Sequence, residues 1–128
     1  MKSIYLSFLT LFIFSCNSND DNNDNCIEYE AAGIELVEPN VNATSNEYLF
    51  DLSFRVKNGC GEFSSIEQNT VGTTTTIKVI AKYEGCICTQ DTPLRKTIYN
   101  FNQTNPGTYT LKFKKADESY ITQEVIIP

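Results

Sequence analysis

From Cys26 to the C-terminus, apolar and polar residues alternate with a period of two, and this pattern constrains the fold most. Successive side chains of a β-strand point to opposite faces, so the pattern is typical of half-buried strands. The clearest runs have apolar residues at Tyr48, Phe50, Leu52, Phe54 and Val56; at Ile77, Val79, Ala81 and Tyr83; and at Tyr109, Leu111 and Phe113. Weaker runs cover residues 28–38, 62–69, 94–102 and 119–127. We therefore expect seven strands and no sustained helix.

Turn-forming residues separate these runs, among them Asn58-Gly59, Gly72, Gly85 and Asn105-Pro106-Gly107. Seven short strands between residues 26 and 128 predict one all-β domain, a two-sheet antiparallel β-sandwich. The threonine run at 73–76 is expected to be the solvated start of a strand.

The turn Pro106-Gly107 leads into Thr108-Tyr109-Thr110-Leu111 and resembles the turn into the sixth strand of immunoglobulin-like domains. In those domains a Tyr near the start of the strand hydrogen-bonds back to the preceding corner. The resemblance implies an immunoglobulin-like sandwich in which Tyr109 makes this bond. Leu111 stands where immunoglobulin domains place their second core Cys, and the chain has no Trp, so the likeness concerns architecture.

The first sixteen residues have the pattern of a lipoprotein leader. A positive Lys2 precedes the uncharged run 4–14, which as a helix would span about 16 Å, half of a hydrocarbon core of about 30 Å. That length is typical of a signal peptide. The run ends in Ile13-Phe14-Ser15-Cys16, which resembles a bacterial lipobox. The resemblance implies a signal peptide over 1–15 and lipidation of Cys16, where two or three acyl chains anchor a protein stably.

Residues 17–25 contain only Asn, Ser and Asp. Such a segment has no apolar surface to bury, so residues 16–25 are expected to form a flexible tether that begins at the lipidated Cys16. The segment is either a plain spacer or an export signal. In the second case it resembles the acidic signal of surface-exposed lipoproteins of Bacteroidota, carried here by Asp20, Asp21 and Asp24.

Composition removes several classes of function. Ten basic and sixteen acidic residues give a net charge of −6, the wrong sign for a nucleic-acid partner. The absence of His excludes Ser-His-Asp and Cys-His catalysis and every metal site that needs imidazole. We expect no catalytic residues, no metal and no cofactor.

Beyond Cys16, four cysteines remain: Cys26, Cys60, Cys86 and Cys88. A bridge within Cys86-Ile87-Cys88 is disfavoured, because two extended residues span about 6.6 Å, near the upper limit for a disulfide. We expect Cys60 to bridge Cys86 or Cys88, and Cys26 to bridge the other. The alternatives are a redox dithiol or a Cu(I) site, but no flanking residue offers a positive charge to stabilise a thiolate.

The mature chain resembles small lipoproteins of flavobacteria. The resemblance rests on Asn58-Gly59-Cys60-Gly61 and on the segments 83–90 and 106–113. It implies a lipid-anchored outer-membrane location, facing either the surface or the periplasm, and it brings no activity with it. We expect a non-catalytic binding or accessory module whose partners are envelope proteins or glycans. The alternatives are a thiol–disulfide oxidoreductase using Cys86 and Cys88, and an inhibitor or protective protein acting through loop 85–93.

Overall fold

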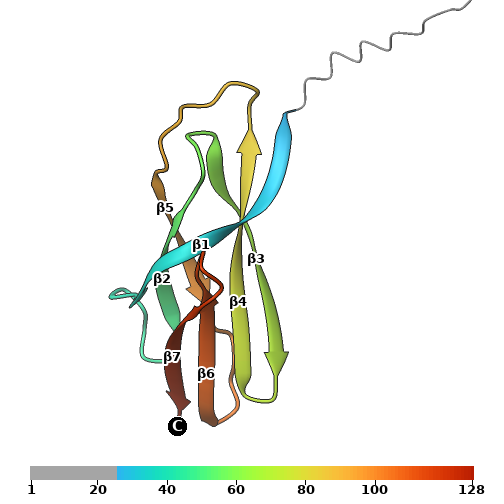
Figure 1. Cartoon of the computed structure of the whole chain (residues 1–128). Coiled ribbons are helices and arrows are strands. Elements are labelled where there is room, and N and C mark those ends of the chain that lie inside the picture. Colours follow the sequence, from blue (N-terminus) through green and yellow to red (C-terminus); the bar gives the residue numbers. More distant parts are fainter. Residues whose placement is uncertain (1–25) are drawn as a thin grey trace, which may run out of the picture.

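The computed structural model describes residues 26–128, which form strands, turns and loops (Figure 1). All seven expected strands are present, and the described residues contain no helix that could cross a membrane. The strands are β1 (Ile27–Pro39), β2 (Leu49–Arg55), β3 (Gly61–Val71), β4 (Thr74–Glu84), β5 (Leu94–Asn100), β6 (Gly107–Lys114) and β7 (Tyr120–Ile127). The expected signal peptide, Cys16 and the tether lie outside the described residues.

The strands form one curled, mixed sheet in the order β5-β2-β1-β4-β6-β7, with β3 paired to β4 off this path. Strand β1 joins the two halves of the sheet. Its first half, from Ile27 to Ala32, pairs with β4, and its second half, from Gly33 to Pro39, pairs with β2. The layer β5-β2-β1 therefore faces the layer formed by β3, β4, β6 and β7 across the core (Figure 1).

The crossing of β1 between the layers depends on Gly33. A Cβ atom at this position would lie 2.6 Å from the Cβ and the backbone nitrogen of Ala116, in the turn between β6 and β7. Real side chains do not approach this closely, so only glycine lets the turn pack against β1 where the strand changes partner.

The expectation of a purely antiparallel sandwich is wrong at one pair, because β4 and β6 are parallel, with Thr74 opposite Thr110 and Ile77 opposite Phe113. Each connection reverses the chain direction. Strand β5 joins β2 in the other layer, so β6 returns to a place beside β4 while running in the same direction. The period-two pattern reports the buried face of a strand but not its neighbours, so the sequence could not reveal this pairing.

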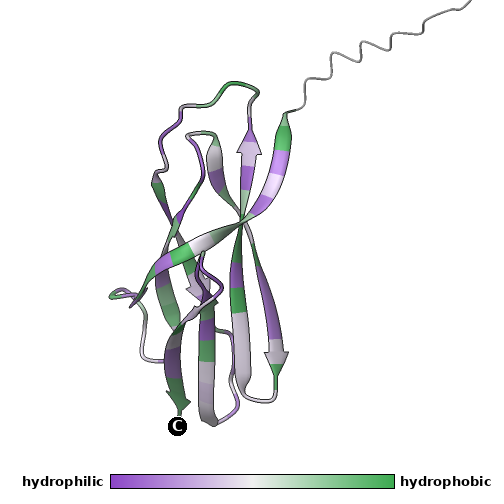
Figure 2. Cartoon of the chain, viewed as in Figure 1, coloured by the Kyte–Doolittle hydropathy of each residue, from purple (hydrophilic) through white to green (hydrophobic). Residues whose placement is uncertain are grey.

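The core contains the apolar faces that the sequence predicts (Figure 2). Leu52, Phe54, Ile77, Leu111 and Phe113 are fully buried, and burial of each such side chain contributes about 1.5–3 kcal/mol. The aromatic rings join the layers across the core: the ring centroids of Phe50 and Phe113 lie 5.9 Å apart, and those of Tyr99 and Phe113 lie 5.7 Å apart.

The corner before β6 has the hydrogen bond that the turn predicts. The Tyr109 hydroxyl donates to the Asn105 carbonyl oxygen at 2.8 Å, and the Tyr109 ring meets the Phe101 ring edge-on with centroids 5.4 Å apart. The bond holds the β5–β6 loop against the start of β6.

The expectation of a solvated threonine run at 73–76 is wrong for Thr75, which is 4% exposed. Thr75 follows the inward alternation of β4 and lies opposite Thr70 of β3. Their hydroxyl groups are 2.9 Å apart and hydrogen-bonded, which allows a polar side chain to be buried there.

Candidate functional site

The loop 85–93, between β4 and β5, is held by both disulfides of the described chain. Cys86 bridges Cys26, with 5.0 Å between the Cα atoms, and Cys88 bridges Cys60, with 5.4 Å. Two disulfides are confirmed, and neither joins Cys86 to Cys88. The structure also decides between the two pairings that the sequence left open.

The geometry of the first bridge is set where the chain leaves β4. Gly85 has a φ of +133°, a conformation that favours glycine, and a Cβ atom there would lie 3.1 Å from the Cys60 sulfur. The Gly85 amide donates to the Cys26 carbonyl at 2.9 Å, which continues the β1–β4 ladder to the bridge. The Gly85 position thus brings the bridged cysteines together.

Backbone hydrogen bonds fix the rest of the loop. The Gly59 amide donates to the Thr89 carbonyl at 3.0 Å, and the Val56 amide donates to the Pro93 carbonyl at 3.2 Å. The loop is therefore attached at both bridged cysteines and at two further points. Little conformational entropy remains for it to lose on binding a partner.

Arg95 of β5 clamps the β2–β3 turn that lies against the loop, a contact that the sequence did not predict. Its guanidinium donates to the Gly61 carbonyl at 2.9 Å and to the Gly59 carbonyl at 3.3 Å. Nothing in the sequence distinguishes Arg95 from the other polar residues of its strand.

Ile87 of loop 85–93 is 95% exposed. It lies between the two bridged cysteines, so its backbone is anchored on both sides. An aliphatic side chain held outward on a fixed loop resembles the anchor residues that fill pockets in protein interfaces. The sequence predicted the loop but not this residue. The signal available was a single large aliphatic residue between two cysteines.

The charges near the loop are locally compensated. Lys57 lies 2.9 Å from Glu28, also pairs with Glu30, and lies 4.7 Å from the centre of the Tyr83 ring. The hydrogen bonds to Glu30 and then to Glu28 raise the pKa of Lys57 above its ordinary value. The positive charge of Lys57 therefore offsets the two neighbouring carboxylates.

Three glutamates of β3 and β4 do not converge into a set of catalytic carboxylates. Each pairs with a different cation: Glu62 with Arg95 at 3.5 Å, Glu67 with Lys78 at 3.0 Å, and Glu84 with Lys82 at 3.4 Å. Within residues 26–128, no group of three or more Cys, Asp or Glu residues is placed to hold a metal.

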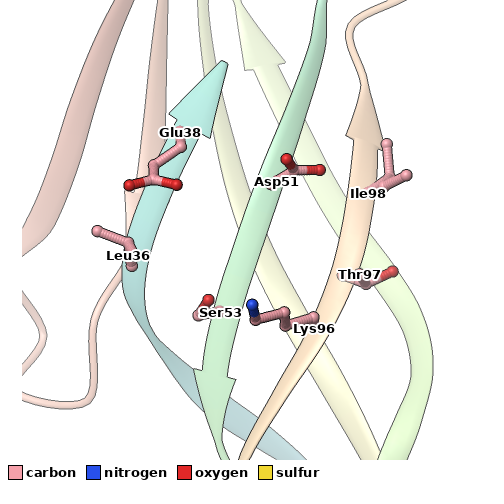
Figure 3. A pocket seen from close by; sticks show the side chains of 7 residues that line it. All are labelled: Leu36, Glu38, Asp51, Ser53, Lys96, Thr97 and Ile98. Carbon is pink, nitrogen blue, oxygen red and sulfur yellow. The ribbon is translucent and has the colours of Figure 1, made fainter. Parts of the chain in front are cut away.

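A cavity of about 650 Å³ forms an open groove on the outer face of the β5-β2-β1 layer (Figure 3). Leu36 and Ile98 form apolar rims over the buried Ser53, and Glu38, Asp51 and Lys96 add charges of both signs. Asp51 accepts a hydrogen bond from Asn40 at 2.8 Å. The lining mixes apolar rims with charges of both signs and shows no single chemical preference.

No curated protein and no solved structure matches the chain. The family described as the ORF11 beta-sandwich domain matches residues 50–125, more than half of the sequence. The match begins in β2 and ends in β7, so it includes Cys60, Cys86, Cys88 and the loop between β4 and β5. The chain belongs to the ORF11 beta-sandwich domain family.

Proposed function

We propose that the protein is an envelope lipoprotein, anchored through Cys16, whose β-sandwich is a non-catalytic binding module. It contacts an envelope protein through loop 85–93, with Ile87 inserted into an apolar pocket of that partner. The observation that carries the proposal is the double bridge: Cys86 and Cys88 are joined to Cys26 and Cys60, which leaves Ile87 fixed and 95% exposed.

The anchor is supported by the leader pattern and by the Asn- and Asp-rich segment 17–25. Nine residues extend at most about 32 Å, so a tethered domain stays near the membrane. Loop 85–93 lies beside the start of β1, at the end of the sandwich where the tether joins (Figure 1). That position favours another envelope protein as the partner, facing the surface or the periplasm.

Direct insertion of the loop into lipid is less favourable, because residues 85–93 carry the negative Asp91 and no cation, and an anionic membrane surface repels negative charge. The Tyr109 corner supports the finer assignment of an immunoglobulin-like sandwich. The resemblance of the motifs at 58–61 and 83–90 supports a flavobacterial lipoprotein.

The arrangement of the cysteines bears differently on the two alternative functions, an oxidoreductase and an inhibitor or protective protein. A thiol–disulfide oxidoreductase needs Cys86 and Cys88 to be free or joined to each other, and the bridges to Cys26 and Cys60 argue against both states. An inhibitor or protective protein needs a rigid, projecting loop, and loop 85–93 has these properties. In that case the partner is an exogenous enzyme with an apolar pocket, and the contact residue is the same.

The proposal is tested with a photoreactive residue at position 90, an exposed position of the loop, in intact cells. We expect one discrete adduct. Ile87→Asp should lower its yield more than tenfold, because loss of a central anchor residue commonly costs at least about 2 kcal/mol of binding energy. Val41→Asp is the matched control, since Val41 is 92% exposed in the β1–β2 loop.

An adduct yield that is equal in the wild type and in Ile87→Asp contradicts the loop contact. The anchor is tested separately: Cys16→Ser should abolish palmitate labelling of the chain. Persistent labelling of that variant contradicts lipidation at Cys16. Disulfide exchange with glutathione at an enzymatic rate by the purified wild type favours the oxidoreductase instead.

A further inference from the structure

A second cavity, of about 170 Å³, lies at the opposite end of the sandwich from the disulfides. It is bounded by the ends of β3 and β5, the β3–β4 turn and the loop that follows β5. Every side chain that lines it is uncharged, whereas the charged residues Glu38, Asp51 and Lys96 line the groove on the β5-β2-β1 layer.

The polar lining interrupts the core pattern of the sheet. Gln68 and Thr70 of β3 pair with Ile77 and Thr75 of β4, so they lie on the same face as these buried residues, although both are exposed at the edge of the sheet. The same face carries fully buried apolar residues further along β4. A polar residue buried at a core-facing position, as Thr75 is, weakens a sandwich unless it serves another purpose.

The hydrogen-bonding groups of the cavity are arranged around aromatic rings. The buried Tyr99 hydroxyl donates to Oε1 of Gln68 at 2.8 Å, which leaves the Gln68 amide NH₂ group available as a donor. The exposed Asn102 side chain has no hydrogen-bond partner in the described chain, and its carboxamide can both donate and accept. The half-buried Tyr109 ring forms part of the wall.

We propose that this cavity binds one neutral sugar ring of a glycan. Carboxamides and hydroxyls both donate and accept, which matches adjacent hydroxyl groups on a sugar. The weakly positive C–H groups of the ring pack against the negative face of an aromatic ring. The volume equals that of about six water molecules at about 30 Å³ each, enough for a single ring and too small for a longer oligomer.

Other ligand classes fit less well. An anionic or cationic ligand finds no opposite charge in the lining. A peptide needs pockets for successive side chains, and a cavity with room for one ring offers only one such pocket. The site faces away from the end where the tether joins, so a tethered domain presents it outward (Figure 1). This cavity is separate from loop 85–93, so the sugar-binding proposal does not depend on the protein contact proposed for that loop.

The test uses the full chain in detergent micelles and saturation-transfer difference NMR, which detects weak binding from the ligand signals. The probes are the methyl glycosides of glucose, galactose and N-acetylglucosamine, with sorbitol and a capped Gly-Ser-Gly peptide as comparisons. We expect signals from at least one glycoside and none from sorbitol or the peptide. Asn102→Ala should weaken binding about three- to tenfold, the effect of one lost hydrogen bond.

Asn69→Ala is the matched control, because Asn69 is exposed on the same strand as Gln68 and Thr70 but lies outside the cavity lining. It should leave binding unchanged. Thr70→Phe should fill the cavity and abolish the signals; if that variant does not fold, Asn102→Ala decides. The proposal is overturned by an absence of signal from every glycoside, by equal signals from the peptide, or by binding that Asn102→Ala leaves unchanged. None of these results bears on cross-linking at loop 85–93, so the two proposals fail separately.

Discussion

The two ends of the sandwich are held by different means. At one end, two disulfides and two backbone hydrogen bonds fix a nine-residue loop, 85–93, that has no regular structure, and Arg95 holds the neighbouring β2–β3 turn. At the other end, β3 and β4 meet in a two-residue turn, and one hydroxyl–carbonyl bond holds the β5–β6 loop. Few backbone hydrogen bonds of the sheet stabilise a long irregular loop, so disulfide bonds restrict its conformation instead. The short β3–β4 turn is ordered by the hydrogen bonds of the two strands that it joins.

The largest expected difference between the ends comes from removing a bridge. The double variant Cys60→Ala/Cys88→Ala should lose about 3–4 kcal/mol in free energy of unfolding, because the bridge spans 28 residues and restricts the unfolded chain. Urea denaturation measures the loss. Amide hydrogen exchange should accelerate in loop 85–93 and stay unchanged at the β3–β4 turn. A loss below about 1 kcal/mol, or equal acceleration at both ends, contradicts the comparison.

Removal of the Arg95 clamp is next in size. Arg95→Ala should cost about 1–3 kcal/mol, because the carbonyl groups of Gly59 and Gly61 lose charged donors in a partly buried setting. Arg95→Lys keeps the charge but lacks the planar fork, so it should recover only part of this loss. Full recovery by lysine in thermal unfolding would show that the charge matters and the geometry does not.

Much of the fold could be predicted because one-sided burial leaves a local signal. Runs such as Phe50-Leu52-Phe54 and Ile77-Val79-Ala81 report the strand and its buried face without reference to distant residues. The parallel pairing of β4 with β6 depends on where β5 is placed, and the crossing of β1 depends on a contact between Gly33 and Ala116. Such long-range relations have no local signature.

The candidate sites could be predicted to a similar extent. The sequence indicated the loop and its distant bridging partners, but Cys86 and Cys88 are two residues apart, and spacing alone could not assign them. The uncharged cavity was missed because Thr75 looks like an ordinary solvated threonine until its strand register is known. Register decides whether a polar side chain faces the solvent or the interior.

A smaller effect on stability is expected from Tyr109, in the corner before β6 at the end opposite the disulfides. Tyr109→Phe removes the hydroxyl that donates to the Asn105 carbonyl at 2.8 Å, and should cost about 0.5–1.5 kcal/mol. For a domain of this size, that lowers the melting temperature by several degrees. Tyr29→Phe is the matched control, because Tyr29 is exposed and its hydroxyl has no hydrogen-bond partner in the described chain. Equal melting temperatures for the two variants would show that the hydrogen bond from Tyr109 to Asn105 does not stabilise the domain.

The smallest expected effect on stability concerns Tyr99, which lines the uncharged cavity. It arises only at alkaline pH. Burial raises the pKa of Tyr99 from its ordinary value of 10.0 to about 12. Between these values the unfolded chain releases the phenolic proton while the folded chain keeps it, so stability falls as the pH rises. The melting temperature of the wild type should therefore decline across this window, and Tyr99→Phe should decline less steeply because it has no proton to release. Parallel declines would show that the Tyr99 hydroxyl is not shielded from solvent. Water would then reach the interior of the sandwich at the end opposite the disulfides.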